Sequence, residues 1–456
     1  MQIEELMERQ RAFFGSGKTI PLRFRRAALE RLRRGIRSHE QEIYTALRAD
    51  LNKFETESYM CEVGMTLSEL SDMLRHMDGW ARKKYKPTPL AQFAATSFTI
   101  REPYGVTLVM SPWNYPFLLT MTPLIGAIAA GNCCVVKPSA YAPATSAVMR
   151  KILRECFTEG FVAVVEGGRA ENQALLDQRF DYIFFTGGVT VGKEVMAKAA
   201  KHLTPVTLEL GGKSPCVVDK TAKLELAAKR IVFGKLLNCG QTCVAPDYIL
   251  VEEDVKDALI GYLKKWIVKM YGEDATENKA YVKMINQKHF DRVTGLIDRE
   301  KVVFGGGWKE DTMQIQPTIL DGVTGDDPVM QEEIFGPVFP ILAVKDMAEA
   351  ERFIREREKP LALYLFTQDK KLADRFLKHV PFGGGCINDT IIHLATSKMG
   401  FGGVGNSGMG SYHGEKSFAT FSHEKSIVQK HTWMDLPVRY APYGAWQEKL
   451  LRMFLR

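Results

Sequence analysis

The chain has 456 residues, of which 45% are hydrophobic and 25% charged, and this composition excludes disordered and collagen-like proteins. Its 61 basic and 54 acidic side chains leave a net charge of +7, a small excess that does not indicate nucleic-acid binding. A chain of this length is expected to fold into about two or three domains.

Export and membrane insertion are not expected. No segment approaches the roughly 18 consecutive apolar residues that span a bilayer, and MQIEELMERQRAFF lacks the basic and apolar regions of a secretory signal. The eight cysteines are therefore predicted to be free thiols in the cytoplasm. Cys239 and Cys243 are four residues apart, but no further His or Cys accompanies them at zinc-ligand spacing, so no metal site is predicted.

The first eighty residues are predicted to be mainly helical. Seven arginines crowd residues 23–37, while Leu22, Leu29, Leu32 and Ile36 recur at helical spacing among them. We interpret the arginines as the solvent face of a docked amphipathic helix, in preference to a nucleic-acid or membrane surface.

Strand-like and helical runs alternate in the middle of the chain. The strand-like runs TLVM, CCVVK, VAVVEG, YIFFTG and VTLEL predict an α/β fold around a largely parallel sheet. A second alternating region extends from about Glu209 to residue 390.

The carboxyl-terminal part has a different character. Seven glycines between Met399 and Gly414 predict an irregular loop with several positive φ angles. AWQEKLLRMFLR predicts a short amphipathic helix that packs against the body of the protein, with peripheral membrane contact as the alternative.

The most informative pair is the carboxylate of Glu209 and the thiol of Cys243, which stand 34 residues apart (243 − 209). A carboxylate and a thiol can act as a base and a nucleophile. A buried cysteine is more often inert packing, so the pair alone leaves both interpretations open. The adjacent glycines Gly211, Gly212 and Gly240 favour close approach of a ligand to the backbone.

Seven strings in a fixed order make a more specific signal. They are PWNYP (112–116), VVKPS (135–139), FFTGG..VGK (184–193), LELGGK (208–213), GQTC (240–243), EEIFGP (332–337) and GFGGVGNSGMGSYHG (400–414). Together they resemble the aldehyde dehydrogenase superfamily. CGQTCVAPDY and SFATFSHEKS are similar to its class 3 or fatty aldehyde dehydrogenase branch.

The resemblance implies an α/β architecture with two domains and a small β element. Residues 1–81 and 103–208 would form a Rossmann-like, dinucleotide-binding domain, and residues 209–395 an α/β catalytic domain. Residues 82–102 and 396–430 would form a bridging element used for oligomerisation, followed by a tail over 431–456. A homodimer is the expected assembly.

The resemblance also assigns the chemistry. Cys243 would attack the aldehyde as a thiolate accessible near neutral pH, and Asn114 with the Cys243 N–H would stabilise the oxyanion of the thiohemiacetal. Glu209, partly desolvated and with a raised pKa, would activate the water that cleaves the thioester. Without the resemblance, Asn114 is more typical of an Asx-type turn ahead of Pro116, and Glu209 of an ion pair with Lys213.

Cofactor binding is not expected to follow the G-x-G-x-x-G pattern, because no such string follows a strand here. Gly187, Gly188 and Gly192 lie where a strand passes into a helix, and a pyrophosphate can bind at such a helix N-terminus, although a plain glycine turn has the same pattern. The resemblance implies contacts to the nicotinamide ribose, the nicotinamide ring and the adenosine ribose, from Glu333, Phe335 and Lys137 respectively.

Two further positions carry predictions. Many relatives have a carboxylate where this chain has Ala140, and its loss removes repulsion toward a 2′-phosphate, so we predict that both NAD and NADP are accepted. Cys239 would lie one turn before Cys243 if that segment is helical. We interpret it as a packing residue, with a reversible disulfide to an oxidised Cys243 as the alternative.

The resemblance therefore implies an NAD(P)-dependent dehydrogenase that converts a medium-chain, long-chain or aromatic aldehyde to its carboxylic acid. A reductase acting on an acyl-enzyme is one alternative, and the intact Glu209 base disfavours it. A non-catalytic binding protein with the same fold is another, and it would not need Asn114, Glu209, Cys243 and Glu333 together.

Overall fold

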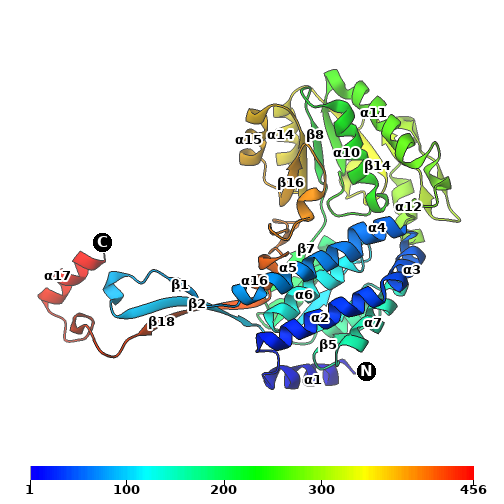
Figure 1. The fold of residues 1–456 in the computed structure, drawn as a ribbon. Helices are drawn as coiled ribbons and strands as arrows, with labels where there is room; N and C mark the ends of the chain where they lie inside the picture. Colours follow the sequence, from blue (N-terminus) through cyan, green and yellow to red (C-terminus); the bar gives the residue numbers. More distant parts are fainter. Residues whose placement is uncertain (1, 456) are drawn as a thin grey trace.

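The computed structural model describes residues 2–455, and the central strands of its two larger sheets coincide with apolar runs of the chain. The strand CCVVK (β4, Cys133–Lys137) is buried along its whole length, as expected for a parallel sheet covered by helices on both faces. Figure 1 shows two α/β units, one above the other, and an arm that extends from the lower unit and carries the C-terminus. The predicted α/β fold is confirmed.

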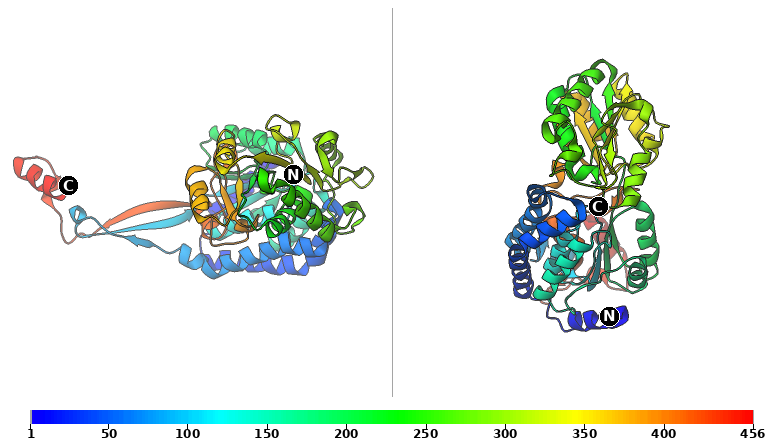
Figure 2. Two further views of the ribbon diagram at one scale, coloured as in Figure 1. Left: turned by 90° about the horizontal axis from the view of Figure 1, so that it is seen from above. Right: turned by 90° about the vertical axis from the view of Figure 1, so that its right-hand side faces the viewer.

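The lower unit is built on a sheet of order β17-β7-β6-β3-β4-β5, parallel except for the antiparallel pair β17-β7. Its strands are β3 (Val106–Met110), β4, β5 (Val162–Val164), β6 (Tyr182–Thr186), β7 (Val206–Glu209) and β17 (Gly408–Met409). Because the crossover connections are helical, helices cover both faces of this sheet (Figure 2).

The helices of the lower unit come mostly from the amino-terminal half. They are α1 (Ile3–Gly15), α2 (Leu22–Ser38), α3 (Glu40–Leu51), α4 (Glu55–Ser58), α5 (Gly64–Trp80), α6 (Leu118–Ala130), α7 (Pro143–Cys156), α8 (Arg169–Leu176) and α9 (Val189–Ala200). A π-helical turn over Tyr59–Val63 joins α4 to α5, and such turns are frequent near functional sites.

The arginine-rich helix α2 docks as predicted, with Leu29, Leu32 and Ile36 fully buried. Arg25 departs from the prediction because it is buried, whereas we expected every arginine to face solvent. Its guanidinium donates hydrogen bonds to the carbonyls of Thr19 and Ile20, both at 2.8 Å, which compensates for the loss of water.

The upper unit contains the sheet β10-β13-β14-β9-β8-β15-β16, parallel except for the antiparallel pair β10-β13. Its strands are β8 (Pro215–Val218), β9 (Tyr248–Glu252), β10 (Val302–Phe304), β13 (Thr318–Leu320), β14 (Val338–Val344), β15 (Ala362–Phe366) and β16 (Gly384–Ile387). A small hairpin, β11 (Trp308–Lys309) and β12 (Gln314–Ile315), lies apart from it. The helices are α10 (Leu224–Leu236), α11 (Glu253–Tyr271), α12 (Gln287–Gly295), α13 (Pro328–Gln331), α14 (Met347–Arg355) and α15 (Lys370–His379).

The arm is an antiparallel sheet of β1 (Lys84–Lys86), β2 (Ala95–Pro103) and β18 (Ser422–Lys430), with β2 in the middle. At its far end lies α17 (Ala445–Phe454), where Trp446 is 57% exposed (Figure 1). The expectation that this helix packs against the body is wrong, because β18 carries the chain away from both α/β units. Among residues 2–455, no helix combines the length and apolar character required to cross a membrane.

The glycine-rich segment between β16 and the arm is irregular, as predicted, with positive φ at Gly405, Gly408, Gly410 and Gly414. It contributes β17 to the lower sheet and is followed by α16 (Glu415–Thr420). Phe418 and Phe421 belong to the hydrophobic core of the lower unit. Much of residues 396–421, which we assigned to the bridging element, thus packs on the lower unit. The bounds predicted for the domains otherwise stay predictions.

Candidate active site

The predicted site residues of the lower unit follow the carboxyl ends of its strands. Asn114 follows β3, Lys137 ends β4, Gly187 follows β6 and Glu209 ends β7. Parallel strands end at the same edge of a sheet, and ligands of open α/β sheets bind outside that edge. The strand order therefore brings these residues together, although they are up to 95 positions apart (209 − 114).

Loops of the upper unit close the other side of this edge. Cys243 lies in the loop before β9, and Glu333 in the loop before β14. The two sides enclose a groove of about 460 Å³. The predicted site residues that line it are Asn114, Gly187, Gly188, Glu209, Cys243, Glu333 and Phe335.

Lys137 and Gly192 do not line this groove. The ammonium group of Lys137 lies at the neighbouring strand end and donates to the carbonyls of Pro138 at 2.9 Å and Gly167 at 2.7 Å. Burial lowers the pKa of Lys137. Gly192 lies inside α9 and provides room for the side chain of Leu210. Contact of either residue with a cofactor stays a prediction.

A second cavity, of about 210 Å³, reaches Cys243 from the other side. Its walls are almost wholly apolar and include Met65, Leu118, Phe233 and Phe401. Cys243 and Leu119 line both the cavity and the groove. The thiol therefore stands where an apolar compartment meets a polar one.

The environment of the Cys243 thiol disfavours its thiolate form. Although Cys243 keeps some surface open to the two cavities, burial raises the pKa of its thiol, and the nearby Glu333 and Glu209 raise it further. These surroundings do not favour the thiolate that we expected near neutral pH, and its formation stays a prediction. Desolvation penalises the charged form, so a neighbouring group must accept the proton.

The loop before Cys243 is not helical. Asn238, Cys239 and Gly240 have successive left-handed φ angles of 53°, 55° and 74°. Cys239 therefore does not lie one helical turn before Cys243, and its fully buried thiol lies 3.4 Å from the hydroxyl of Tyr281. This environment favours packing as its role over a redox function.

Asn114 does not form the Asx-type turn that we considered. Its side-chain amide donates to the carbonyl of Gln241 at 2.9 Å, across 127 positions of the chain. Only 3% of Asn114 is exposed. The amide nitrogen carries two hydrogens, so one remains for a ligand in the groove that Asn114 lines.

Glu209 is buried, and neither of its carboxyl oxygens has a hydrogen-bond partner within residues 2–455. Burial raises the pKa of Glu209 well above that of an ordinary glutamate. The alternative ion pair with Lys213 is not formed, since the ammonium of Lys213 lies 2.8 Å from Asp247 instead. An unpaired buried carboxylate with high proton affinity is characteristic of a general base.

Glu333 borders the groove from the opposite side. Burial, with a smaller effect of Asp247, raises the pKa of Glu333 to about 8. A Cβ atom on Gly211 would lie 2.1 Å from the Glu333 carboxylate, so only glycine permits this approach. Backbone and carboxylate thus meet closely at the groove wall.

The sequence prediction missed an aromatic wall of the groove. The rings of Trp113 and His289 lie 4.8 Å apart between centroids, and those of Trp113 and Phe335 lie 5.4 Å apart. Burial lowers the pKa of His289 to about 4, so this ring is neutral. Trp113 is part of PWNYP and could have been identified from the sequence, whereas nothing in the pattern around His289 indicates a site.

The groove has features that suit a dinucleotide. The amino terminus of α9 opens into it at Gly188 and Val189. No side chain among the described residues caps its free N–H groups, which can therefore receive a phosphate. Glu333 can accept hydrogen bonds from ribose hydroxyls. No group of three or more His, Cys, Asp or Glu side chains in the described part of the chain is arranged to hold a metal ion.

Comparison with known proteins agrees with this geometry. Residues 1–427 match the aldehyde dehydrogenase family. The 4,4'-diaponeurosporen-aldehyde dehydrogenase of Staphylococcus aureus is 46% identical, over 97% of this chain and 96% of its own length. The dimeric NADP-preferring aldehyde dehydrogenase of Canis lupus familiaris is also 46% identical, over 97% and 98%.

Two further similarities concern the branch and the fold. Aldehyde dehydrogenase family 3 member A2 of Macaca fascicularis is 46% identical, over 94% of this chain and 88% of its own length. The substrate-bound structure of Staphylococcus aureus AldH has a TM-score of 0.98 at 45% identity and covers 100% of this chain and 99% of that one. The chain therefore belongs to the aldehyde dehydrogenase family, as an NAD(P)-dependent oxidoreductase.

Proposed function

We propose that this enzyme oxidises an apolar aldehyde to its carboxylic acid through a covalent intermediate on Cys243. The observation that supports this most strongly is the position of Cys243 between an apolar cavity and a polar groove. A hydrocarbon chain can lie in the cavity while its aldehyde carbon meets the sulfur, and a cofactor can approach the same carbon from the groove.

The reaction begins with loss of the Cys243 proton to a carboxylate at the groove. Glu209 and Glu333 are the candidates, because burial gives both a high affinity for protons. The sulfur then adds to the aldehyde carbon, and the electron pair of the C=O bond moves to the oxygen. The free N–H of Asn114 and the backbone N–H of Cys243 stabilise this oxyanion in a thiohemiacetal.

The oxidation would be supplied by NAD or NADP bound in the groove, as the acceptor of the hydride from the thiohemiacetal carbon. Gly187, Gly188 and the start of α9 would hold its phosphates, and Glu333 and Phe335 would orient its reactive end; all of them line the groove, which supports these roles. Glu209 then takes a proton from water, which attacks the remaining thioester. The Cys243 thiolate leaves, and the carboxylic acid is released.

The lining of the cavity supports medium-chain, long-chain or aromatic aldehydes as substrates. Methionine, leucine and phenylalanine side chains dominate its wall, so it favours an alkyl chain or a ring over a charged group. One relative is named for 4,4'-diaponeurosporen-aldehyde, which supports an aldehyde as the substrate.

Cofactor choice, assembly and location complete the proposal. Ala140 is exposed and offers no charge against a 2′-phosphate, and one relative is named as NADP-preferring and dimeric, which supports dual cofactor use and a homodimer. All eight cysteines are free, which supports a reducing compartment such as the cytoplasm.

The test is a panel of alkyl, aromatic and charged aldehydes, assayed by cofactor reduction with NAD and NADP in parallel. Apolar aldehydes are expected to give the higher kcat/KM, and Cys243→Ala is expected to show no turnover. Cys239→Ala is the matched control, because it removes a neighbouring thiol that does not line either cavity. Oxidation at the parent rate by Cys243→Ala would exclude the covalent route.

A further inference from the structure

A fully buried ion pair lies behind the proposed oxyanion donor, and the reaction described above does not use it. The ammonium of Lys53 lies 2.6 Å from a carboxylate oxygen of Glu62, and both side chains are 0% exposed. Within residues 2–455, no other ion pair has both side chains fully buried. Burying two charges is costly, and apolar residues of similar size often serve stability as well, so stability is a weak explanation for this pair.

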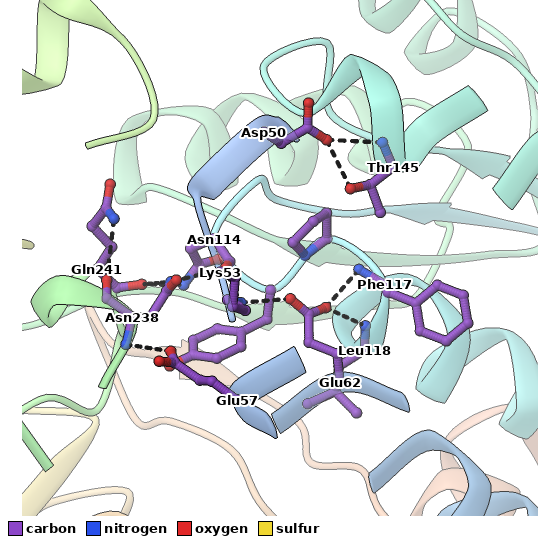
Figure 3. Close-up of polar contacts among 12 residues, drawn as sticks. Asp50, Lys53, Glu57, Glu62, Asn114, Phe117, Leu118, Thr145, Asn238 and Gln241 are labelled. Carbon is purple, nitrogen blue, oxygen red and sulfur yellow. Dashed lines mark hydrogen bonds and ion pairs between the residues drawn. The ribbon is translucent and has the colours of Figure 1, made fainter. Parts of the chain in front are cut away.

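Lys53 makes two further contacts, both to the loop that carries Asn114. Its ammonium donates to the carbonyl of Asn114 at 3.4 Å and lies 4.3 Å from the ring centre of Tyr115. Figure 3 shows Lys53 between Glu62 and the Asn114 backbone. One cation thus holds consecutive residues of the loop from behind.

Glu62 holds the far end of the same loop. Its second carboxylate oxygen accepts hydrogen bonds from the N–H groups of Phe117 at 2.9 Å and Leu118 at 3.1 Å, at the amino terminus of α6 (Figure 3). A carboxylate is stabilising there, because the first N–H groups of a helix have no partner within the helix. Lys53 and Glu62 together therefore restrain both the middle and the end of the loop.

The carbonyl of Asn114 also connects this loop to residues 238–243, which end at Cys243 and are called the nucleophile loop below. Asn238 donates from its side-chain amide to the carbonyls of Asn114 at 2.8 Å and Gln241 at 3.1 Å. Asn238 has a left-handed backbone, and its own N–H donates to Glu57 at 2.8 Å. Two donors thus converge on one carbonyl. Fixing that carbonyl restrains the backbone from which the Asn114 side chain projects.

We propose that Lys53, paired with Glu62, is a positioning residue of the reaction. It fixes the carbonyl of Asn114, and through it keeps the Asn114 amide directed at the oxyanion that forms beside Cys243. This inference rests on the proposed role of Asn114. Lys53 itself touches neither the groove nor the apolar cavity.

The test removes both charges at once, with Lys53→Met combined with Glu62→Gln, so that no buried charge is left unpaired. A displacement of about 1 Å in a catalytic group costs about 100-fold in rate, so kcat for aldehyde oxidation is expected to fall about 10- to 100-fold. The Kd for the cofactor and the rate of Cys243 alkylation by iodoacetamide are expected to stay unchanged. Alkylation proceeds without an oxyanion, so it reports whether the nucleophile itself remains intact.

Two comparisons separate positioning from a structural role. Lys53→Arg keeps the charge and is expected to retain most of kcat. In an Asn114→Ala background, removal of the two charges is expected to cause no further loss, because the donor that they position is already absent. Asp50→Asn is the matched control: Asp50 is also buried and accepts a hydrogen bond from the Thr145 N–H at 2.8 Å, but it does not touch the Asn114 loop (Figure 3). It is expected to keep kcat at saturating cofactor.

Three results would overturn the inference: full kcat in the charge-free variant, an equal loss in both backgrounds, or a parallel fall in Cys243 alkylation. The proposed function fails in a different way. If Asn114→Ala alone turns over at the parent rate, the oxyanion role of Asn114 is wrong, whatever Lys53 does. If Asn114→Ala is impaired while the charge-free variant is not, only the positioning role is wrong.

Discussion

At the scale of single residues, Glu209 shows most clearly how the site departs from what stability alone favours. A buried carboxylate without a hydrogen-bond partner is costly in a fold, and it is useful only if it takes up a proton during the reaction. Glu209→Gln keeps the size of the side chain and removes that capacity. Because Glu333 remains to accept the Cys243 proton, we expect a burst of about one equivalent of reduced cofactor per site, followed by turnover slowed about 10²- to 10⁴-fold.

Rapid mixing with absorbance detection distinguishes the burst from the steady state, and mass spectrometry identifies the thioester. The pH profile supplies a second measurement. Because burial raises the pKa of Glu209, the parent is expected to lose thioester hydrolysis as the pH falls through that raised pKa. The variant is expected to lack this acidic limb. A variant without a burst that hydrolyses at the parent rate would rule out Glu209 as the base.

Ala140 carries the prediction about cofactor choice. The residue is exposed after Lys137, at the strand end where the adenosine ribose is expected. Ala140→Glu introduces a carboxylate that repels a 2′-phosphate and accepts hydrogen bonds from a free ribose. We expect kcat/KM for NADP to fall about tenfold or more, equivalent to about 1.4 kcal/mol, and that for NAD to stay the same or rise. A variant that lost activity equally with both cofactors would place Ala140 outside the ribose site.

At the scale of elements, the sequence predicted the site residues that stand in short strings next to strands. Asn114, Glu209 and Cys243 stand in short strings next to recognisable strands, and the topology of parallel strands brings strand ends together. Lys53 and Glu62 could not be found in this way. Lys53 lies in the short connection between α3 and α4 and Glu62 in the π-helical turn, and neither stands in one of the recognisable strings. Their burial results from packing against a loop more than fifty positions away. The raised pKa of the Cys243 thiol was not predicted for a related reason, since desolvation depends on everything that surrounds the thiol.

The nucleophile loop carries a prediction about stability. Three successive left-handed residues precede Gln241, and a Cβ on Gly240 would lie 2.3 Å from the carbonyl oxygen of Gly336. Gly240→Ala is therefore expected to lower the free energy of unfolding by at least about 2 kcal/mol and to abolish turnover. Chemical denaturation measures the first effect, and aldehyde oxidation the second.

Gly261→Ala is the matched control for this loop. Gly261 lies in α11, and a Cβ there would meet nothing within 4 Å. Alanine in a helix interior is expected to stabilise the protein by about 0.5–1 kcal/mol relative to glycine. If Gly240→Ala were as stable and as active as the parent, the left-handed backbone of the loop would not be required.

At the scale of the whole molecule, the two α/β units form the candidate active site, and the arm has a separate role. The lower unit holds Glu209 and Asn114, the proposed base and oxyanion donor, and the upper unit holds Cys243, the proposed nucleophile, and Glu333. The candidate site therefore forms only where the two units meet. The arm contributes nothing to either cavity wall. It exposes apolar residues along its length and at its tip, including Val428, Trp433, Tyr443 and Trp446. Apolar surface of this kind is typical of a protein interface.

The last prediction follows from that surface. Val428 in β18 is 54% exposed, and a lysine there would place a charge in a dimer interface built from the arm. Val428→Lys is expected to raise the dimer dissociation constant about tenfold or more, which corresponds to about 1.4 kcal/mol. Leu377→Lys is the matched control, because Leu377 is 55% exposed on α15, away from the arm. Light scattering across a dilution series measures both variants. A parent chain that stays monomeric, or an equal weakening by Leu377→Lys, would show that the arm is not the interface.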